Sequence, residues 1–160
     1  GEPFQSTLIA APPGAGKTTL LREMVAALSN GSEERAPLRV GIVDERGELA
    51  GMYRGVPQLD VGFHTDVLDS CPKTLGIPML MRSANPQVIA VDEITTAEDL
   101  TAMAAAANCG VALLATIHAL DEEELRRKPL YPVLAASQVF RRLITISVEA
   151  GQRRYQVRPL

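Results

Sequence analysis

Short apolar runs alternate along the chain with segments of helical periodicity. Each apolar run ends at polar or glycine residues, which is typical of a buried β-strand. The expected strands cover residues 7–10, 38–43, 88–91 and 111–117. Between them, apolar side chains recur every three or four positions, and the expected helices cover residues 18–28, 73–83 and 96–107. This alternation favours a parallel sheet whose crossovers are right-handed.

The C-terminal part follows a different pattern. Short helices are expected over residues 121–125 and 133–139, and strands over 143–148 and 154–158. Ala150 and Gly151 separate the two strands and predict a hairpin turn. We therefore expect an α/β fold with three layers, helices on both faces of a mostly parallel sheet, and an antiparallel hairpin at the C-terminal edge.

Residues 46–72 make a connection that is longer than usual in a compact α/β domain. The connection is rich in turn-forming residues and has weak periodicity. Residues 66–69 are expected to form a helical turn within it. Connections of this length tend to be functional or disordered.

Length and composition describe one globular domain over residues 1–160, with 46% hydrophobic and 22% charged residues. The start of the sequence, almost at the first strand, suggests the C-terminal domain of a longer protein. A net charge of -3 and 4% aromatic residues make nucleic acid an unlikely partner. The apolar segment 102–117 is too short and interrupted for direct membrane insertion. Cys71 and Cys109 form no C-x-x-C pair, which favours a reducing cytoplasm.

The stretch APPGAGKTT, residues 11–19, lies between the first strand and the first helix. It fits the phosphate-binding pattern G-x-x-x-x-G-K-[ST], except that Ala11 replaces the first glycine. Glycines let successive N–H groups turn inward around an anion, Lys17 adds a positive charge, and the Thr18 hydroxyl suits Mg²⁺. The residues expected to bind the nucleotide are Pro13, Gly14, Ala15, Gly16, Lys17, Thr18 and Thr19.

Polar side chains also follow the later strands, at positions where the carboxyl ends of parallel strands meet. Asp92 follows strand 88–91 and is expected to hold Mg²⁺ together with Thr18. Glu93 comes next and is expected to act as the general base that activates water. The alternative for both acids is a pair of exposed residues at the start of a helix.

Two further strand ends carry candidate catalytic residues. Asp44 and Glu45 follow strand 38–43, and we place Glu45 in the catalytic set, the alternative being a solvated strand end. His118 follows strand 111–117 and is expected to sense the γ-phosphate or to couple it to a neighbouring subunit. Its alternative is a hydrogen-bonded cap.

Positive charge for the departing phosphate has to come from arginine. The candidates are Arg46, Arg54 and Arg82, from the same chain or an adjacent protomer, and each is otherwise an ordinary surface arginine. The acidic run 121–124 predicts a solvated helix face.

These residues resemble a known family. Residues 81–119, MRSANPQVIAVDEITTAEDLTAMAAAANCGVALLATIHA, are similar to the second acidic box and histidine box of type II/IV secretion and pilus-retraction ATPases. The fuller set resembles the ATPase domain of the stage III sporulation protein AA family from residue 7 to about 148. Its segments are APPGAGKTTLLREM, GIVDERGELAG, FHTDVLDSCPKTLGIPMLMRS, VIAVDEI and LLATIHA.

The resemblance implies a RecA-like P-loop ATPase that uses ATP and Mg²⁺ and forms a homo-oligomeric ring, a hexamer. It also implies a place in the mother-cell cytoplasm, beside a membrane-associated sporulation or secretion complex whose proteins are its partners. Three positions depart from the family pattern. They are Ala11, His64 in place of an expected arginine, and Thr95-Thr96 in place of a glycine and a basic residue. The last two departures remove positive charge near the expected site.

Three functions remain open at this point. The favoured one is an ATP-hydrolysing ring motor that powers transport or assembly during sporulation. The second is a nucleotide-gated scaffold that binds ATP with little turnover, which the lost basic residues favour. The third is a nucleic-acid-stimulated ATPase of the helicase type.

Overall fold

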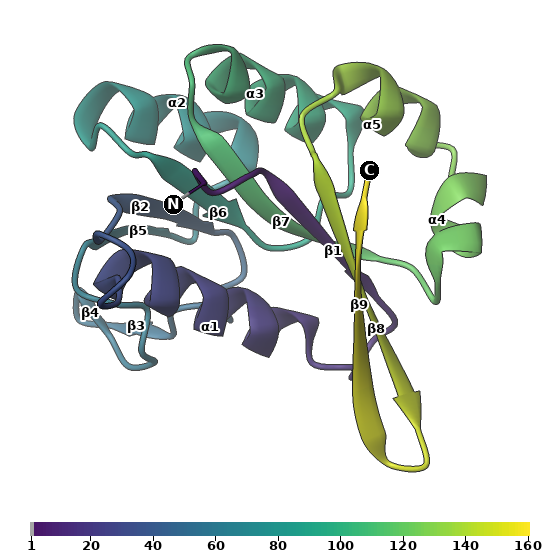
Figure 1. Cartoon of the computed structure of the whole chain (residues 1–160). Helices are drawn as coiled ribbons and strands as arrows, with labels where there is room; N and C mark the ends of the chain where they lie inside the picture. Colours follow the sequence, from purple (N-terminus) through teal and green to yellow (C-terminus); the bar gives the residue numbers. More distant parts are fainter. Residues whose placement is uncertain (1) are drawn as a thin grey trace.

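A seven-stranded sheet runs through the middle of the molecule, with helices on both faces (Figure 1). The computed structural model describes residues 2–160, so Gly1 of the expected domain lies outside it. The strand order is β5-β2-β6-β7-β1-β8-β9. Its strands are β1 (Thr7–Ala11), β2 (Val40–Asp44), β5 (Thr65–Asp69), β6 (Val88–Val91), β7 (Ala112–His118), β8 (Arg142–Glu149) and β9 (Gln152–Pro159). All neighbours pair in parallel except β8 and β9, which form the expected antiparallel hairpin.

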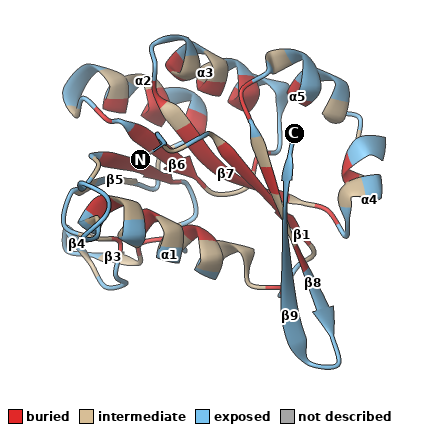
Figure 2. Cartoon of the chain, viewed as in Figure 1, coloured by how far each residue is buried: buried red, intermediate tan, exposed pale blue. Residues whose placement is uncertain are grey.

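The helices form the outer layers. Helix α1 (Lys17–Asn30) covers one face of the sheet, and three others cover the opposite face: α2 (Lys73–Ser83), α3 (Ala97–Asn108) and α5 (Tyr131–Ser137). Helix α4 (Glu122–Arg127) follows β7. Figure 2 shows that burial concentrates in the central strands and the helix faces turned toward them. The expected three-layer α/β/α architecture is confirmed.

Two hydrophobic clusters hold the layers together. One joins Leu21 and Val25 of α1 to the sheet, and the other joins Ile77 of α2 and Met103 of α3 to the opposite face. Glycines allow α2 to approach closely. A β-carbon on Gly76 would lie 2.6 Å from Cγ1 of Val43 in β2. This approach explains a glycine inside α2, where it costs about 1 kcal/mol relative to alanine.

The expected helical turn at residues 66–69 is wrong. These residues belong to β5, which pairs with β2 so that Thr65 lies opposite Val40 and Asp69 opposite Asp44. A strand this short carries little local signal, and its hydrogen bonds to β2 decide its conformation.

The connection around β5 is packed rather than disordered. It contains a small hairpin, β3 (Met52–Tyr53) and β4 (Val56–Pro57), and buries Leu49, Ala50 and Val61 in the same cluster as α1. These apolar side chains, spaced along a turn-rich segment, therefore hold the connection against the hydrophobic core.

Candidate functional site

The glycine loop, residues 12–16, connects β1 to α1 at the carboxyl edge of the sheet. Gly14 and Gly16 have φ of 74° and 92°, a region that favours glycine. Gly16 is the N-cap of α1 and supplies no side-chain hydrogen bond. The first N–H groups of the helix therefore lack a side-chain acceptor, and the positive end of the helix dipole is open to an anion.

Neighbouring strands bring the predicted polar residues to this same edge. Strands β2, β6, β7 and β1 are adjacent in that order, and their registers align Val43 with Val91, Val91 with Ala115, and Ala11 with His118. The residues that follow these strands consequently lie at the same edge of the sheet, with the ends of β7 and β1 extending three residues farther than the end of β6 and two farther than the end of β2. The structure thus gathers the strand ends that sequence reasoning expected to converge.

An oxygen cluster joins the first turn of α1 to the acids that follow β6. The Thr18 hydroxyl donates to Oδ2 of Asp92 at 3.3 Å, and the Thr116 hydroxyl donates to Oδ1 at 2.7 Å. The amide of Glu93 donates to the Thr116 hydroxyl at 2.8 Å. Hydroxyl and carboxylate oxygens are the donors that Mg²⁺ prefers, so Thr18 and Asp92 fit that ion.

Thr116 is a site residue that sequence reasoning missed. It is fully buried in β7 and holds both the Asp92 side chain and the Glu93 backbone. A threonine inside the apolar run 111–117 was the available signal, because a buried hydroxyl needs a hydrogen-bond partner.

Glu93 has two unusual features. Its φ is 38°, a left-handed conformation that is uncommon outside glycine and often marks functional sites. Its carboxylate forms an ion pair with Arg46, which lies on the loop after β2. The hydrogen bond and the charge of Glu93 raise the pKa of Arg46.

Of the three candidate arginines, only Arg46 contacts the acids of this edge in residues 2–160. Arg54 lies over the ring of Tyr53, with its Cζ 5.4 Å from the ring centroid. Arg82 occupies the last turn of α2. Because that turn leads into the amino end of β6, Arg82 stands at the edge opposite the glycine loop.

Asp44 shapes the loop that carries Glu45 and Arg46. It is buried, and its carboxylate accepts hydrogen bonds from the amides of Leu49 at 3.2 Å and Ala50 at 2.9 Å. A solvated strand end is therefore excluded for Asp44. Its carboxylate fixes a turn at the site instead of facing a ligand.

Lys73 is a second residue that sequence reasoning missed. It is the first residue of α2, is buried, and forms ion pairs with Glu45 and, at 3.7 Å, with Asp99 of α3. This pairing ties the loop after β2 to two helices. The signal was its place in the CPK segment, 71–73. The catalytic role of Glu45 stays a prediction.

His118 is the last residue of β7 and is half-buried beside the glycine loop. Within residues 2–160, its ring takes part in no hydrogen bond or ion pair, so the alternative of a hydrogen-bonded cap has no support. The acidic run behaves as expected: Asp121 caps α4, and Glu122 and Glu123 pair with arginines one turn on. None of the helices in residues 2–160 is both long enough and apolar enough to cross a membrane.

A family model described as sporulation stage III, protein AA, matches residues 2–157. The chain belongs to this family. Stage III sporulation protein AA of Bacillus subtilis strain 168 is 41% identical over 146 residues, which make up 91% of this chain and 48% of that protein. The chain therefore spans less than half the length of that relative.

Solved structures of low sequence identity share the fold of this member of the stage III sporulation protein AA family. The Legionella pneumophila ATPase DotB has a TM-score of 0.69 at 19% identity, covering 98% of this chain and 45% of its own. The pilus retraction motor PilT with bound ADP has a TM-score of 0.65 at 17% identity, covering 98% and 47%. The fold is thus the RecA-like fold of secretion and pilus-retraction ATPases.

The two departures that remove positive charge have structural roles in this sporulation protein AA domain. The His64 amide donates to the Ser29 hydroxyl at 2.7 Å, and the His64 ring Nδ1 lies 2.9 Å from the Ser29 carbonyl oxygen. It therefore anchors the start of β5 to the C-terminal turn of α1. Thr96 forms a capping box with Asp99 at the start of α3.

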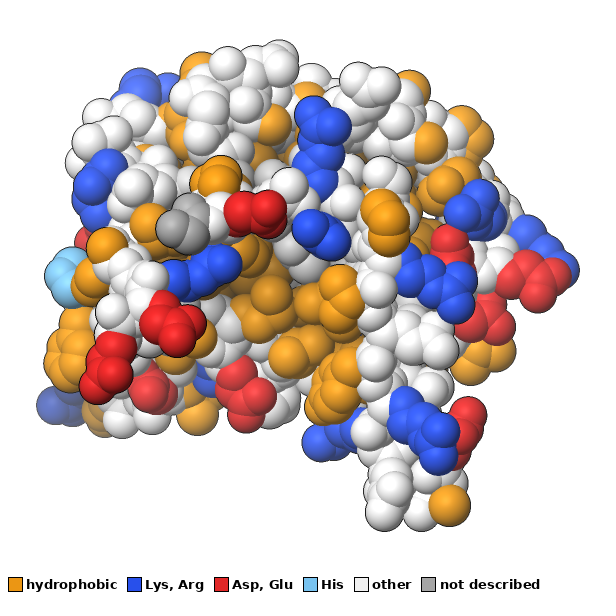
Figure 3. All heavy atoms as spheres, in the orientation of Figure 1, with side chains coloured by type: hydrophobic (Ala, Val, Ile, Leu, Met, Phe, Trp, Pro, Cys, Tyr) orange, Lys and Arg blue, Asp and Glu red, His pale blue; other side chains and the backbone are white. Residues whose placement is uncertain are grey.

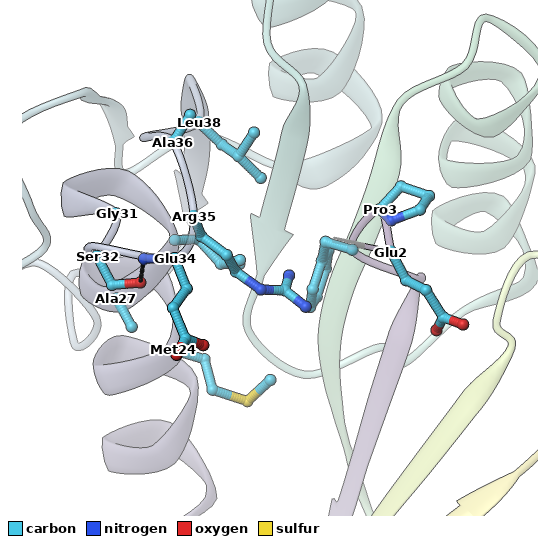
Figure 4. A pocket seen from close by; sticks show the side chains of 12 residues that line it. Glu2, Pro3, Met24, Ala27, Gly31, Ser32, Glu34, Arg35, Ala36 and Leu38 are labelled. Carbon is cyan, nitrogen blue, oxygen red and sulfur yellow. Dashed lines mark hydrogen bonds between the residues drawn. The ribbon is translucent and has the colours of Figure 1, made fainter.

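An apolar hollow of about 500 Å³ lies elsewhere in this domain (Figure 4). Its lining includes Phe4, Met24, Leu28 and Leu38, near the C-terminal half of α1. Figure 3 shows apolar side chains gathered in the middle of this face. No residue of the glycine loop lines the hollow, so it is separate from the oxygen cluster at the other end of α1.

Proposed function

We propose that this domain binds ATP with Mg²⁺ at the glycine loop and hydrolyses it as part of a ring motor in sporulation. The observation that carries the proposal is the contact between the Thr18 hydroxyl and Asp92, 74 positions apart in the sequence. It joins a bare helix N-terminus, which suits phosphates, to an acid that suits Mg²⁺ and is followed by Glu93.

Each residue has a separate task in this proposal. The glycine-loop amides, Lys17 and Thr19 bind phosphate oxygens, and Thr18 with Asp92 holds the metal. Bound Mg²⁺ supplies positive charge to the β- and γ-phosphate oxygens. Glu93 accepts a proton from the attacking water. The Thr116 hydroxyl accepts a hydrogen bond from the Glu93 amide and so holds the Glu93 backbone in place for this step.

Three further residues surround the reacting phosphate in the proposal. Arg46 offsets negative charge at the departing phosphate, and His118 senses that phosphate from the end of β7. Glu45 is kept in the proposed catalytic set, where its ion pair with Lys73 holds it.

The assembly is proposed on weaker similarity. The family is one of sporulation proteins, and PilT is a pilus retraction motor. We propose a homo-oligomeric ring, a hexamer, that works in the mother-cell cytoplasm beside proteins of a membrane complex. Sizing the full-length protein with and without an ATP analogue and Mg²⁺ tests the ring, and a monomer under both conditions contradicts it.

The central test is Mg²⁺-dependent phosphate release from ATP by the wild-type domain and by Glu93→Gln. We expect the variant to lose hydrolysis by at least about 100-fold while it still binds nucleotide, because a general base contributes about that much or more. The matched control is Glu98→Gln, an exposed acid in the first turn of α3. Unchanged hydrolysis in Glu93→Gln removes Glu93 from its role, and absence of nucleotide binding by the wild type overturns the proposal.

One observation favours the second candidate, a nucleotide-gated scaffold. The ion pair with Arg46 occupies the carboxylate that would accept the proton. Single-turnover kinetics over a range of protein concentrations separate the two functions. A motor with sites shared between protomers accelerates as protomers associate, whereas a scaffold binds ATP and releases phosphate slowly at every concentration.

A further inference from the structure

The side chain of Arg153 in β9 lies directly against the glycine loop. A β-carbon on Gly16 would come within 3.0 Å of its Cζ, 3.1 Å of its Nε and 3.2 Å of its Nη2. Real β-carbons rarely have neighbours this close, so the guanidinium group fills the space beside the Gly16 α-carbon. Residues 137 positions apart in the sequence thus meet where α1 begins.

The β8–β9 hairpin brings Arg153 to this position. Strand β8 pairs with β1 up to Thr145 opposite Ala10, and then continues to Glu149 past the end of β1. Strand β9 returns antiparallel and places Arg153 opposite Val148. In Figure 1 the hairpin projects beyond the sheet beside the N-terminal end of α1. The projecting part therefore stands next to the glycine loop as a side wall.

The charges around this contact are unbalanced. Neither Lys17 nor Arg153 forms an ion pair with a carboxylate in the described part of the chain, and the positive end of the α1 dipole adds to them. The next residue behaves differently: Arg154 pairs with Glu149 at 3.3 Å. Alternation along β9 separates the two arginines onto opposite faces. Only Arg153 faces the glycine loop.

We propose that Arg153 binds the polyphosphate of the nucleotide from within the same chain. The inference rests on the proposed ATP site and adds to it a second cation, supplied by the C-terminal hairpin. A planar guanidinium can form two parallel hydrogen bonds with phosphate oxygens, which a lysine cannot reproduce. The β8–β9 hairpin is then part of the nucleotide site, and Arg153 compensates for the basic residues lost at His64 and Thr95-Thr96.

The test compares Arg153→Gln with Arg154→Gln as a matched control on the other face of β9. Affinities of both variants and the wild type are measured with a fluorescent non-hydrolysable ATP analogue, Mg²⁺ present, and with adenosine by competition. We expect Arg153→Gln to bind the analogue at least about tenfold more weakly, the range for a hydrogen bond to a charged group. Arg154→Gln should stay within about twofold of the wild type, and Arg153→Lys should recover part of the loss.

The outcomes separate this inference from the proposed function. If the wild type binds the analogue and Arg153→Gln binds equally well, the role of Arg153 is overturned and the ATP site stands. An equal loss in Arg154→Gln, or an equal loss of adenosine affinity, also overturns it, because the effect would then be a general disturbance of the hairpin. If the wild type does not bind the analogue, both proposals fail. Thermal unfolding of each variant checks that the fold is intact. Because Arg153 is exposed, its replacement should not change the unfolding temperature.

Discussion

The guanidinium of Arg46 contacts the carboxylate of Glu93 across the carboxyl edge of the sheet. The two residues are 47 positions apart and come together because β2 and β6 are neighbours. Asp44 holds the loop that presents Arg46, and Thr116 holds the backbone of Glu93. Two buried residues, Asp44 and Thr116, thus position the guanidinium of Arg46 and the carboxylate of Glu93 where the proposed chemistry occurs.

Replacing Arg46 tests which effect this ion pair has on catalysis. We expect Arg46→Ala to lower ATP hydrolysis at saturating ATP by about tenfold or more, because the arginine orients Glu93 and offsets charge on the departing phosphate. Nucleotide affinity should change little, and stability by about 1 kcal/mol at most, since Arg46 is half-exposed. Phosphate release and nucleotide titration measure the two effects. A faster rate in the variant would show instead that Arg46 restrains Glu93 from reacting.

Thr116 should matter for both stability and Mg²⁺. Thr116→Val keeps the shape of the side chain but removes the hydroxyl that donates to Asp92 and accepts from Glu93. We expect a loss of about 1–3 kcal/mol in the free energy of unfolding, because buried partners are left unsatisfied. The Mg²⁺ concentration needed for nucleotide binding should also rise several-fold.

Thr7→Val is the matched control for Thr116. Thr7 is buried in the adjacent strand β1, and its hydroxyl bonds to the Gln5 carbonyl away from the site. Chemical denaturation should detect destabilisation in both variants, whereas a Mg²⁺ titration should shift only in Thr116→Val. A shift of the same size in both would contradict the role assigned to Thr116.

Glu122 gives a prediction about pH. The Glu122 carboxylate accepts a hydrogen bond from Arg126 at 2.8 Å within α4, and one from Arg158 at 2.9 Å that joins α4 to β9. The hydrogen bond from Arg126 is the largest cause of a pKa of Glu122 below its usual 4.5. A folded-state pKa below the unfolded one adds stability above about pH 4.5, and this stability is lost as the pH falls toward the folded value.

The measurement for Glu122 is denaturant unfolding of Glu122→Gln and wild type at neutral and acidic pH. At pH 7 the variant should be less stable by up to about 1 kcal/mol, the range for surface pairs. The difference should disappear on acidification below the folded pKa. Glu123→Gln is the control, because within residues 2–160 Glu123 pairs with Arg127 alone, on an exposed helix face. If the difference in unfolding free energy between Glu122→Gln and wild type persists in acid, the charge of Glu122 is not its cause.

Much of the fold was readable from local pattern. The apolar runs at 88–91 and 111–117 are strands β6 and β7 with nearly the expected bounds, because burial on both faces demands continuous apolar sequence. The glycine loop could be recognised because its residues have the spacing of a phosphate-binding motif and lie between a predicted strand and a predicted helix. Residues 66–69 were misread, since a short edge strand depends on its neighbour for its hydrogen bonds.

Outside residues 46–72, the sequence by itself determined the order of the elements, the glycine loop, and the acids Asp92 and Glu93 at a strand end. These features depend on residues close together in the chain, whose spacing and chemistry are visible without a fold. Only the tertiary structure decided that Thr116 holds both acids, that Lys73 engages Glu45, and that Arg153 rests on Gly16. Each of these contacts joins residues that are far apart in the sequence. The order and register of the strands, set by packing of the whole sheet, bring them together.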